Sequence, residues 1–218
     1  IRMYKRMLQS ILKIGLPAGF EAIMYSISNI IVQVSINNFG VDTMAAWTAY
    51  SKIDFIFWMI NSAFGISVMT FVGQNYGAGK WDRIRRGTKI CLGMALISAV
   101  SVSIILMSAE RFLFGIFVND AGVVEIGIRM MNVIAPAYLL FAFIEVFSGA
   151  LRAQGAVVVS TLITMVGICV LRMIWVTLVA VHGTLEQVII CYPITWAAGA
   201  LAMSIYYIYK QRKIFQAR

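Results

Sequence analysis

The chain has 218 residues, of which 61% are hydrophobic and only 12% are charged, and its mean hydropathy is +0.87. This composition excludes a water-soluble domain, because a surface so apolar would aggregate in water. The net charge of +9 does not indicate nucleic acid as a partner, since the basic residues cluster in short segments between apolar runs. Membrane lipid is the expected environment, and an all-α integral membrane protein is the expected fold class.

Apolar runs of about 20 residues recur along the chain, and each is long enough to cross a bilayer as one helix. Residues 1–13 alternate basic and apolar side chains and predict an amphipathic helix at the cytoplasmic membrane surface. Residues 14–209 predict a bundle of six transmembrane helices, and residues 210–218 a basic cytoplasmic tail. The six expected spans cover residues 14–37, 45–72, 90–107, 126–151, 156–181 and 188–209.

Three local features refine this outline. Pro136 lies well inside the fourth span, where a missing backbone N–H predicts a kink. Residues 73–89 read GQNYGAGKWDRIRRGTK and predict a loop in contact with water. The loop does not match a phosphate-binding Walker A motif, because Gln74 and Trp81 occupy positions that need Gly and Ser or Thr. The chain begins with Ile1 and not with Met, so we interpret it as a piece of a longer protein.

Other reactive residue types lack partners in the sequence. The cysteines, Cys91, Cys169 and Cys191, lie in apolar stretches without CxxC spacing, so they are predicted to be reduced packing residues. His182 is the only histidine, which argues against a histidine-based metal site or catalysis. We therefore expect no enzyme, no cofactor and no metal other than a transported Na⁺.

The distribution of Lys and Arg predicts the topology. Short segments on one side of the expected spans carry 14 of the 18 basic residues. These are Arg2, Lys5, Arg6, Lys13, Lys80, Arg83, Arg85, Arg86, Lys89, Arg152, Lys210, Arg212, Lys213 and Arg218. Because excess positive charge in short loops marks the cytoplasmic side, both termini are expected in the cytoplasm, with an even number of spans.

Charged residues inside the spans are the main candidates for function, because a charge in hydrocarbon costs at least about 2.5 kcal/mol without a partner or water. Polar and aromatic residues extend these positions into stripes along spans one, two and four, at helical spacing. The candidate substrate or ion-binding residues are Glu21, Tyr25 and Ser28 in span one, Asp54, Trp58 and Asn61 in span two, and Tyr138, Phe141 and Glu145 in span four. The three stripes predict one shared wet cavity.

The two glutamates are expected to meet within that cavity. Glu21 lies about 7 Å and Glu145 about 9 Å to the cytoplasmic side of the midpoints of their spans, at 1.5 Å per residue. Two carboxylates at one depth would favour binding of a proton or Na⁺. Glu21 begins the polar stripe of span one, so it is expected to matter for coupling more than for folding. The alternative is that each carboxylate hydrogen-bonds locally to hold helices together, or extends to the membrane interface.

The intramembrane cations are predicted to be structural. Lys52 and Asp54 are two residues apart and point in different directions along a helix, so they should not pair with each other. Arg172, in the outer half of span five, is expected to form a structural ion pair, with Asp54 as one candidate partner, or to reach the interface.

Several motifs together resemble those of one transporter family. They are Gly73–Gly79 followed by Arg83, Leu16–Gly19 at the start of span one, Ser51–Asp54 in span two, and Ser148–Gly155 at the end of span four. The chain resembles the second, C-terminal lobe of the multidrug and toxic compound extrusion (MATE) family over essentially its whole length. The loop motif and the segment ending span four are fairly specific in combination.

The resemblance implies a fold and a function. It implies two six-helix lobes around a central cavity, with alternating access and efflux of organic cations or drugs in exchange for Na⁺ or H⁺. The implied partners are an N-terminal six-helix lobe, a small-molecule substrate and the lipid of the inner (plasma) membrane. Some relatives carry cation-binding acids about one turn from Glu21 and Glu145, nearer Tyr25 and Phe141, and others carry the proton-coupling Asp in the first lobe.

Two alternative functions remain at this point. A lipid-linked oligosaccharide flippase of the same superfamily would be expected to line its cavity with more basic groups, for which only Lys52 and Arg172 are candidates. An ion channel would need a repeated filter-like segment and a membrane enzyme a polar catalytic cluster, and neither is visible in the sequence.

Overall fold

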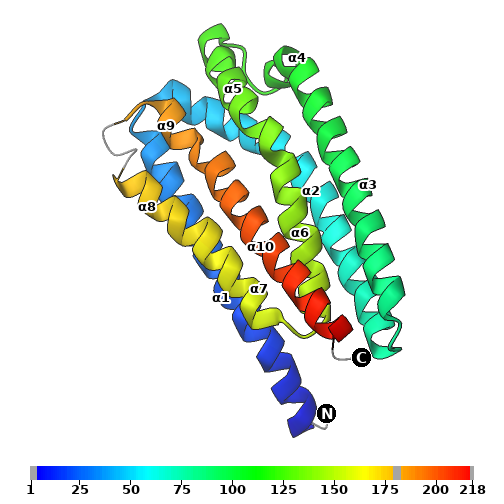
Figure 1. Ribbon diagram of the computed structural model, residues 1–218. Coiled ribbons are helices and arrows are strands. Elements are labelled where there is room, and N and C mark those ends of the chain that lie inside the picture. Colours follow the sequence, from blue (N-terminus) through cyan, green and yellow to red (C-terminus); the bar gives the residue numbers. More distant parts are fainter. Residues whose placement is uncertain (1–3, 179–182, 217–218) are drawn as a thin grey trace.

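The computed structural model describes residues 4–178 and 183–216, which form helices joined by short turns (Figure 1). The elements are α1 Lys5–Asn37, α2 Val41–Gly77, α3 Trp81–Ser108, α4 Glu110–Gly115, α5 Ala121–Ile134, the 3₁₀ turn η1 Ala135–Ala137, α6 Tyr138–Ala153, α7 Val157–Thr164, the π-helical turn η2 Met165–Val170, α8 Leu171–Leu178, α9 Leu185–Ile189 and α10 Cys191–Gln216. Within these described residues, six helical segments are long and apolar enough to cross a membrane, which agrees with the predicted number of spans. His182 lies outside the described residues.

The spans run up and down between two ends of the bundle (Figure 1). One end carries the start of α1, the turn between α2 and α3, the turn between α6 and α7, and the end of α10; we call it the basic end. The far end carries the α1–α2 turn, α4 and α9. The predicted cytoplasmic segments thus gather at one end, and which side of a membrane that end faces stays a prediction.

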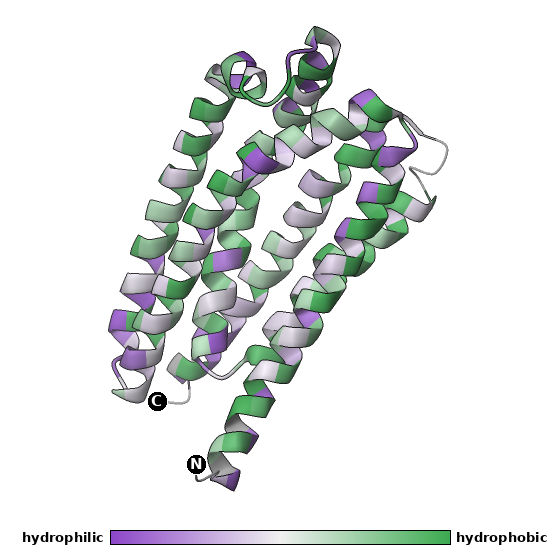
Figure 2. Cartoon of the chain, turned by 180° about the vertical axis from the view of Figure 1, so that it is seen from behind, coloured by the Kyte–Doolittle hydropathy of each residue, from purple (hydrophilic) through white to green (hydrophobic). Residues whose placement is uncertain are grey.

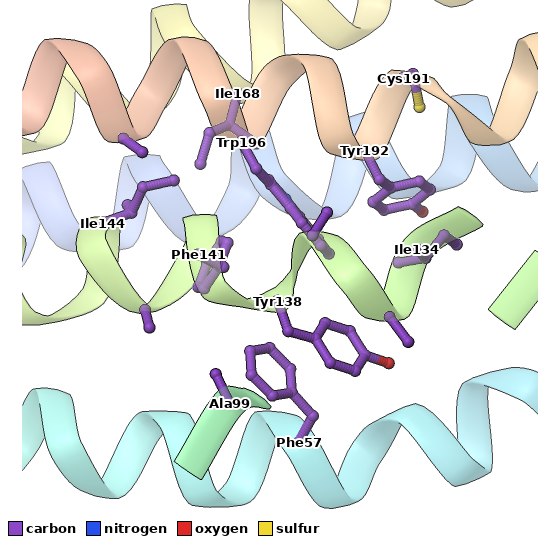
Figure 3. Packing of buried hydrophobic residues seen from close by; sticks show 14 of the residues in the cluster. Phe57, Ala99, Ile134, Tyr138, Phe141, Ile144, Ile168, Cys191, Tyr192 and Trp196 are labelled. Carbon is purple, nitrogen blue, oxygen red and sulfur yellow. The ribbon is translucent and has the colours of Figure 1, made fainter. Parts of the chain in front are cut away.

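Many large apolar residues are exposed on the helices, as expected for helices in lipid. Figure 2 shows apolar residues, in green, along most of the length of the helices. On α3 the exposed apolar residues include Ile90, Met94, Ile97 and Ile104. α6 is the central helix, because it packs against α2, α3 and α10. Figure 3 shows the aromatic residues at its start, where Tyr138 stacks on Phe57 at 3.9 Å between ring centroids.

Among the described residues, two spans contain a turn of another helix type, and the sixth span is interrupted at Ile190 between α9 and α10. The fourth span changes to the 3₁₀ turn Ala135–Ala137 at Pro136, which confirms the predicted kink, because proline cannot donate the helical hydrogen bond. The fifth span contains the π-helical turn Met165–Val170, which the sequence did not indicate. An added Cβ at Gly167 in this turn would lie 3.3 Å from the Cα of Gly199, so the fifth and sixth spans approach closely here.

Three predicted boundaries differ from the structure. Most of the expected loop 73–89 is helical, because α2 continues to Gly77, α3 begins at Trp81 and only three residues form the turn. The turn needs glycine only at Gly79, whose φ is +66°. The segment predicted to be a separate surface helix is continuous with the first span in α1, from Lys5 onward, and its position at a membrane surface stays a prediction. The described part of the basic tail likewise continues α10.

The predicted thiol state of the cysteines agrees with the structure. All three are free, with Cys169 and Cys191 buried and Cys91 half-buried. The described residues contain no group of three or more His, Cys, Asp or Glu side chains placed to hold a metal ion.

Candidate functional site

The predicted polar stripes line two cavities and not one. The cavity nearer the basic end, which we call the acid cavity, has a volume of about 360 Å³. It is lined by Glu21, Tyr25, Gly65, Ile66, Met69, Phe141, Ile144, Glu145, Ser148, Gly149, Arg152 and Thr164. The structure therefore brings the two glutamates from α1 and α6 into one cavity, whereas their depth in a membrane stays a prediction.

Glu21 is held by a cation and a hydroxyl. The Nη2 atom of Arg152 donates to both carboxylate oxygens, at 2.7 and 2.8 Å, and the Thr161 hydroxyl donates to Oε2 at 2.9 Å. The ion pair is largely shielded, since 13% of the Glu21 side chain and 27% of the Arg152 side chain are exposed. These bonds join α1 to α6 and α7. The sequence placed Arg152 among the basic residues of the expected cytoplasmic segments and gave no reason to pair it with Glu21.

Glu145 differs from Glu21, because no hydrogen bond or ion pair joins it to another described residue. Its carboxylate lies against Gly65 of α2, where an added Cβ would be 2.1 Å from Oε1. Glu145 and Arg152 are seven residues apart on α6, which places them two turns apart on one helix face. The acid cavity thus contains two carboxylates and one guanidinium, and only one carboxylate is paired.

The second cavity, which we call the aromatic cavity, lies nearer the far end and has a volume of about 460 Å³. Its lining residues are Tyr25, Asn29, Gln33, Trp47, Tyr50, Ser51, Asp54, Phe55, Trp58, Ile134, Tyr192 and Trp196. Tyr25 also lines the acid cavity, so the two cavities meet at this residue.

Asp54 is surrounded by aromatic donors in the aromatic cavity. The Trp58 indole Nε1 donates to Oδ2 at 2.6 Å, the Tyr50 hydroxyl donates to Oδ1 at 3.3 Å, and the Tyr138 hydroxyl also donates to Oδ1. The hydroxyls of Tyr50 and Tyr138 are themselves 3.2 Å apart. Three donors from two spans therefore satisfy this carboxylate without a basic residue.

The intramembrane cations do not pair with Asp54. Arg172 is buried, its Nη1 donates to the Asn29 side chain at 3.1 Å, and its guanidinium lies 4.2 Å from the ring centroid of Tyr192. The ion pair expected between Arg172 and Asp54 is wrong, because an amide and aromatic rings surround the guanidinium instead. Lys52 is exposed and lies 5.9 Å from the ring of Phe117.

The remaining predicted site residues divide between the cavities and the core. Phe141 and Trp58 pack together at 4.6 Å between centroids, so they belong to one aromatic cluster with Trp196. Ser28 and Asn61 are buried and line neither cavity. The sequence missed Tyr192 and Trp196, since α10 carries no charge in this region to draw attention to them (Figure 3).

The family is shown by comparison with known proteins. The MatE family model matches residues 17–178. The chain belongs to this family of multidrug and toxic compound extrusion transporters. It is 25% identical over 219 residues to the probable multidrug resistance protein YoeA of Bacillus subtilis, an alignment that covers 98% of this chain and 47% of YoeA. It is 23% identical over 158 residues to human multidrug and toxin extrusion protein 1, covering 70% of this chain and 28% of the human protein.

Solved MATE structures share the fold. An outward-facing multidrug resistance MATE transporter matches with a TM-score of 0.89 and 16% identity, over 99% of this chain and 49% of that one. An inward-facing structure matches with a TM-score of 0.83 and 16% identity, over 99% of this chain and 50% of the other. The chain therefore spans about half the length of these transporters and less than half of the curated relatives named above.

Proposed function

We propose that the chain is one lobe of a cation-coupled antiporter that exports organic cations or drugs by alternating access, in exchange for Na⁺ or H⁺. The observation that carries the proposal is the unpaired carboxylate of Glu145 beside the Glu21–Arg152 ion pair. With both acids ionised, the acid cavity holds two negative charges and one positive charge. One proton or one Na⁺ at Glu145 would cancel the remaining charge, which favours binding of a single cation inside the membrane.

The two glutamates have different roles in this proposal. Glu21 is fixed by Arg152 and Thr161, so it ties α1 to α6 and α7 and shapes the cavity. Glu145 makes no hydrogen bond or ion pair with another described residue, so a cation can bind its carboxylate without first breaking an ion pair. Glu145 is therefore the proposed coupling residue, and Glu21 the residue that keeps Arg152 away from it.

The relatives, the aromatic cavity and the basic end support the other parts of the proposal, which are the partner lobe, the substrate and the orientation in the membrane. They are about twice the length of this chain, which supports an N-terminal six-helix lobe as the partner that this lobe rocks against. The aromatic cavity, with Trp47, Trp58 and Trp196 beside Asp54, suits a hydrophobic organic cation as the substrate. The basic end is the proposed cytoplasmic side, so both termini would lie in the cytoplasm of a plasma membrane protein.

The flippase alternative receives less support from the cavities. A lipid-linked pyrophosphate would need basic groups around it, yet the acid cavity is lined by two acids and one arginine. Arg172 is buried against Asn29 and two tyrosine rings, and Lys52 lies outside both cavities. These placements favour a positively charged cargo and a coupling cation.

Glu145→Gln in the full-length protein tests the proposal. The change keeps the size of the side chain and removes its negative charge, so ion-driven dye efflux from proteoliposomes should fall at least tenfold, at unchanged levels of inserted protein. Glu125→Gln is the matched control, because Glu125 is 51% exposed at the far end and pairs with Arg111. Ion-driven efflux at the normal rate in Glu145→Gln would remove Glu145 from the coupling mechanism.

A further inference from the structure

A third cavity lies away from both sites, between α3 and α10 at the basic end. It has a volume of about 320 Å³ and is lined by Arg85, Lys89, Tyr207, Ile208, Gln211 and Arg212. We call it the α3–α10 pocket. α3 and α10 both pack against α6, and the pocket lies between them. Three of the six lining residues are cationic and none is acidic, so the pocket has the charge to hold an anion.

The α10 wall of this pocket is held in place by hydrogen bonds. Gln211 is buried and its Nε2 donates to the Gln154 side chain at 3.0 Å, while Lys210 Nζ donates to the Gln154 carbonyl at 2.9 Å. These bonds attach the end of α10 to the turn between α6 and α7. Arg212 on α10 and the α3 residues Arg85 and Lys89 therefore line one pocket whose α10 wall is fixed to the α6–α7 turn.

One residue that lines the pocket, Tyr207, has a hydroxyl without a hydrogen bond of normal geometry. Tyr207 is 8% exposed and its ring stacks on Phe147 at 4.5 Å between centroids. Its hydroxyl lies near that of Thr88, which is 1% exposed, but neither makes a hydrogen bond of normal geometry to another described residue. A ligand with acceptor oxygens would give the Tyr207 hydroxyl a partner, whereas an apolar ligand would not.

The pocket lies near the basic-end termini of two candidate spans. The candidate span of α10 ends at Ile214 and that of α3 begins at Trp81, so Arg212 lies in the last turn of one span and Arg85 and Lys89 lie within the first three turns of the other. Toward the middle of the bundle, α3 presents the exposed apolar residues Ile90 and Met94, and Ile208 is half exposed on α10. An amphipathic ligand with an anionic head and apolar chains fits this arrangement better than a soluble anion does.

We propose that the α3–α10 pocket binds the phosphate headgroup of an acidic glycerophospholipid, whose acyl chains lie along the apolar surface of α3. The site is independent of the proposed coupling mechanism, because it shares no lining residue with the acid or aromatic cavity. A bound lipid would link α3 to the end of α10, and so stabilise the basic end of this lobe.

Lipid-dependent stabilisation of the purified full-length protein tests the site. Thermal unfolding in detergent is followed while phosphatidylglycerol, phosphatidylcholine or inorganic phosphate is added. Phosphatidylglycerol should raise the unfolding temperature more than phosphatidylcholine does. The triple variant Arg85→Gln, Lys89→Gln and Arg212→Gln should weaken apparent phosphatidylglycerol binding by about fivefold for each cation removed.

The control variant removes the same charge outside the pocket. Arg83, Arg86 and Lys213 are exposed near the same helix ends and do not line the pocket, so their triple change to Gln should retain most of the phosphatidylglycerol effect. Equal losses in both triple variants would mean diffuse surface attraction and overturn the site. Stabilisation by inorganic phosphate as large as that by phosphatidylglycerol would overturn the lipid as its ligand.

Discussion

The aromatic cavity and the acid cavity each contain a membrane-embedded carboxylate, but their surroundings differ. In the aromatic cavity, Asp54 accepts hydrogen bonds from Tyr50, Trp58 and Tyr138. In the acid cavity, Glu145 accepts none from a described residue and lies against Gly65. Both residues are acids within a predicted span, so residue type alone does not separate them.

The difference indicates what each carboxylate is suited to do. Three neutral donors around Asp54 offset the free-energy cost of removing its carboxylate from water, and they connect α2 to the start of α6. Removing the Asp54 carboxylate would leave these buried donors without an acceptor. Glu145 has no such bonds, so its removal leaves no protein group unsatisfied. Asp54 is thus expected to matter most for stability, and Glu145 most for ion coupling.

The largest expected effect on stability is that of Asp54→Ala. The change leaves the Trp58 N–H and two tyrosine hydroxyls without their shared acceptor, at a cost of about 1 to 3 kcal/mol for each group left buried and unpaired. The unfolding temperature of the full-length protein in detergent should fall clearly, whereas Asp54→Asn, which keeps one acceptor oxygen, should lose less. Equal stability of Asp54→Ala and wild type would contradict a structural role for the aromatic donors.

A double-mutant cycle on Glu21 and Arg152 should give an intermediate effect. Glu21→Gln leaves a partly buried guanidinium without its carboxylate, and Arg152→Gln leaves the carboxylate without its cation, so each single change should destabilise the protein. The double variant should recover part of the loss, with a coupling energy of about 1 to 2 kcal/mol.

The cycle is measured by denaturation in detergent, with Arg111 and Glu125 as the matched control pair. That pair is 74% and 51% exposed, and exposed ion pairs contribute about 0 to 1 kcal/mol, so its coupling should be smaller. If the two pairs give the same coupling, the shielding of Glu21 and Arg152 has no energetic consequence, and Glu21 loses its proposed structural role.

The sequence predicted the fold well because membrane crossing imposes a simple rule. About 20 apolar residues make a span, and Pro136 marks a kink by its missing N–H. The prediction of a loop at residues 73–89 was wrong, because a helix in a membrane protein can extend beyond the hydrocarbon region. Polar residues such as Gln74 and Asn75 then remain part of the helix. The π-helical turn Met165–Val170 was missed because the sequence there is as apolar as its neighbours.

The candidate site was predictable in part. Helical spacing placed Glu21 and Glu145 on stripes that reach one cavity, because period and depth follow from helix geometry. Which side chains form ion pairs depends on how each helix is rotated about its axis and how closely neighbouring helices pack. The sequence of a single span does not specify either quantity. The ion pair of Glu21 with Arg152 and the stacking of Arg172 on Tyr192 therefore needed the structure.

The smallest expected effect on stability, and the most specific test of Glu145, comes from Gly65→Ala. The added methyl would lie 2.1 Å from Glu145 Oε1, so the carboxylate must turn away from α2 while the backbone stays in place. An altered rotamer of Glu145 should cost about 0.5 to 1.5 kcal/mol of stability. The better helix propensity of alanine should contribute about 1 kcal/mol in the opposite direction. Stability should change by less than about 1 kcal/mol, while the concentration of Na⁺ or H⁺ needed for half-maximal efflux should rise.

Two other glycines separate this effect from crowding in general. Gly93→Ala meets no heavy atom within 4 Å, so it should leave efflux unchanged and raise stability by up to about 1 kcal/mol through the better helix propensity of alanine. Gly149→Ala places its Cβ 2.8 Å from the Gly65 carbonyl oxygen, and backbone cannot turn aside as a side chain can, so it should cost about 1 to 3 kcal/mol of stability. If the Gly65→Ala protein has normal stability and needs the same concentration of Na⁺ or H⁺ for half-maximal efflux, coupling does not depend on the position of the Glu145 carboxylate. The difference between Glu145 and Asp54 would then affect only how the helices pack.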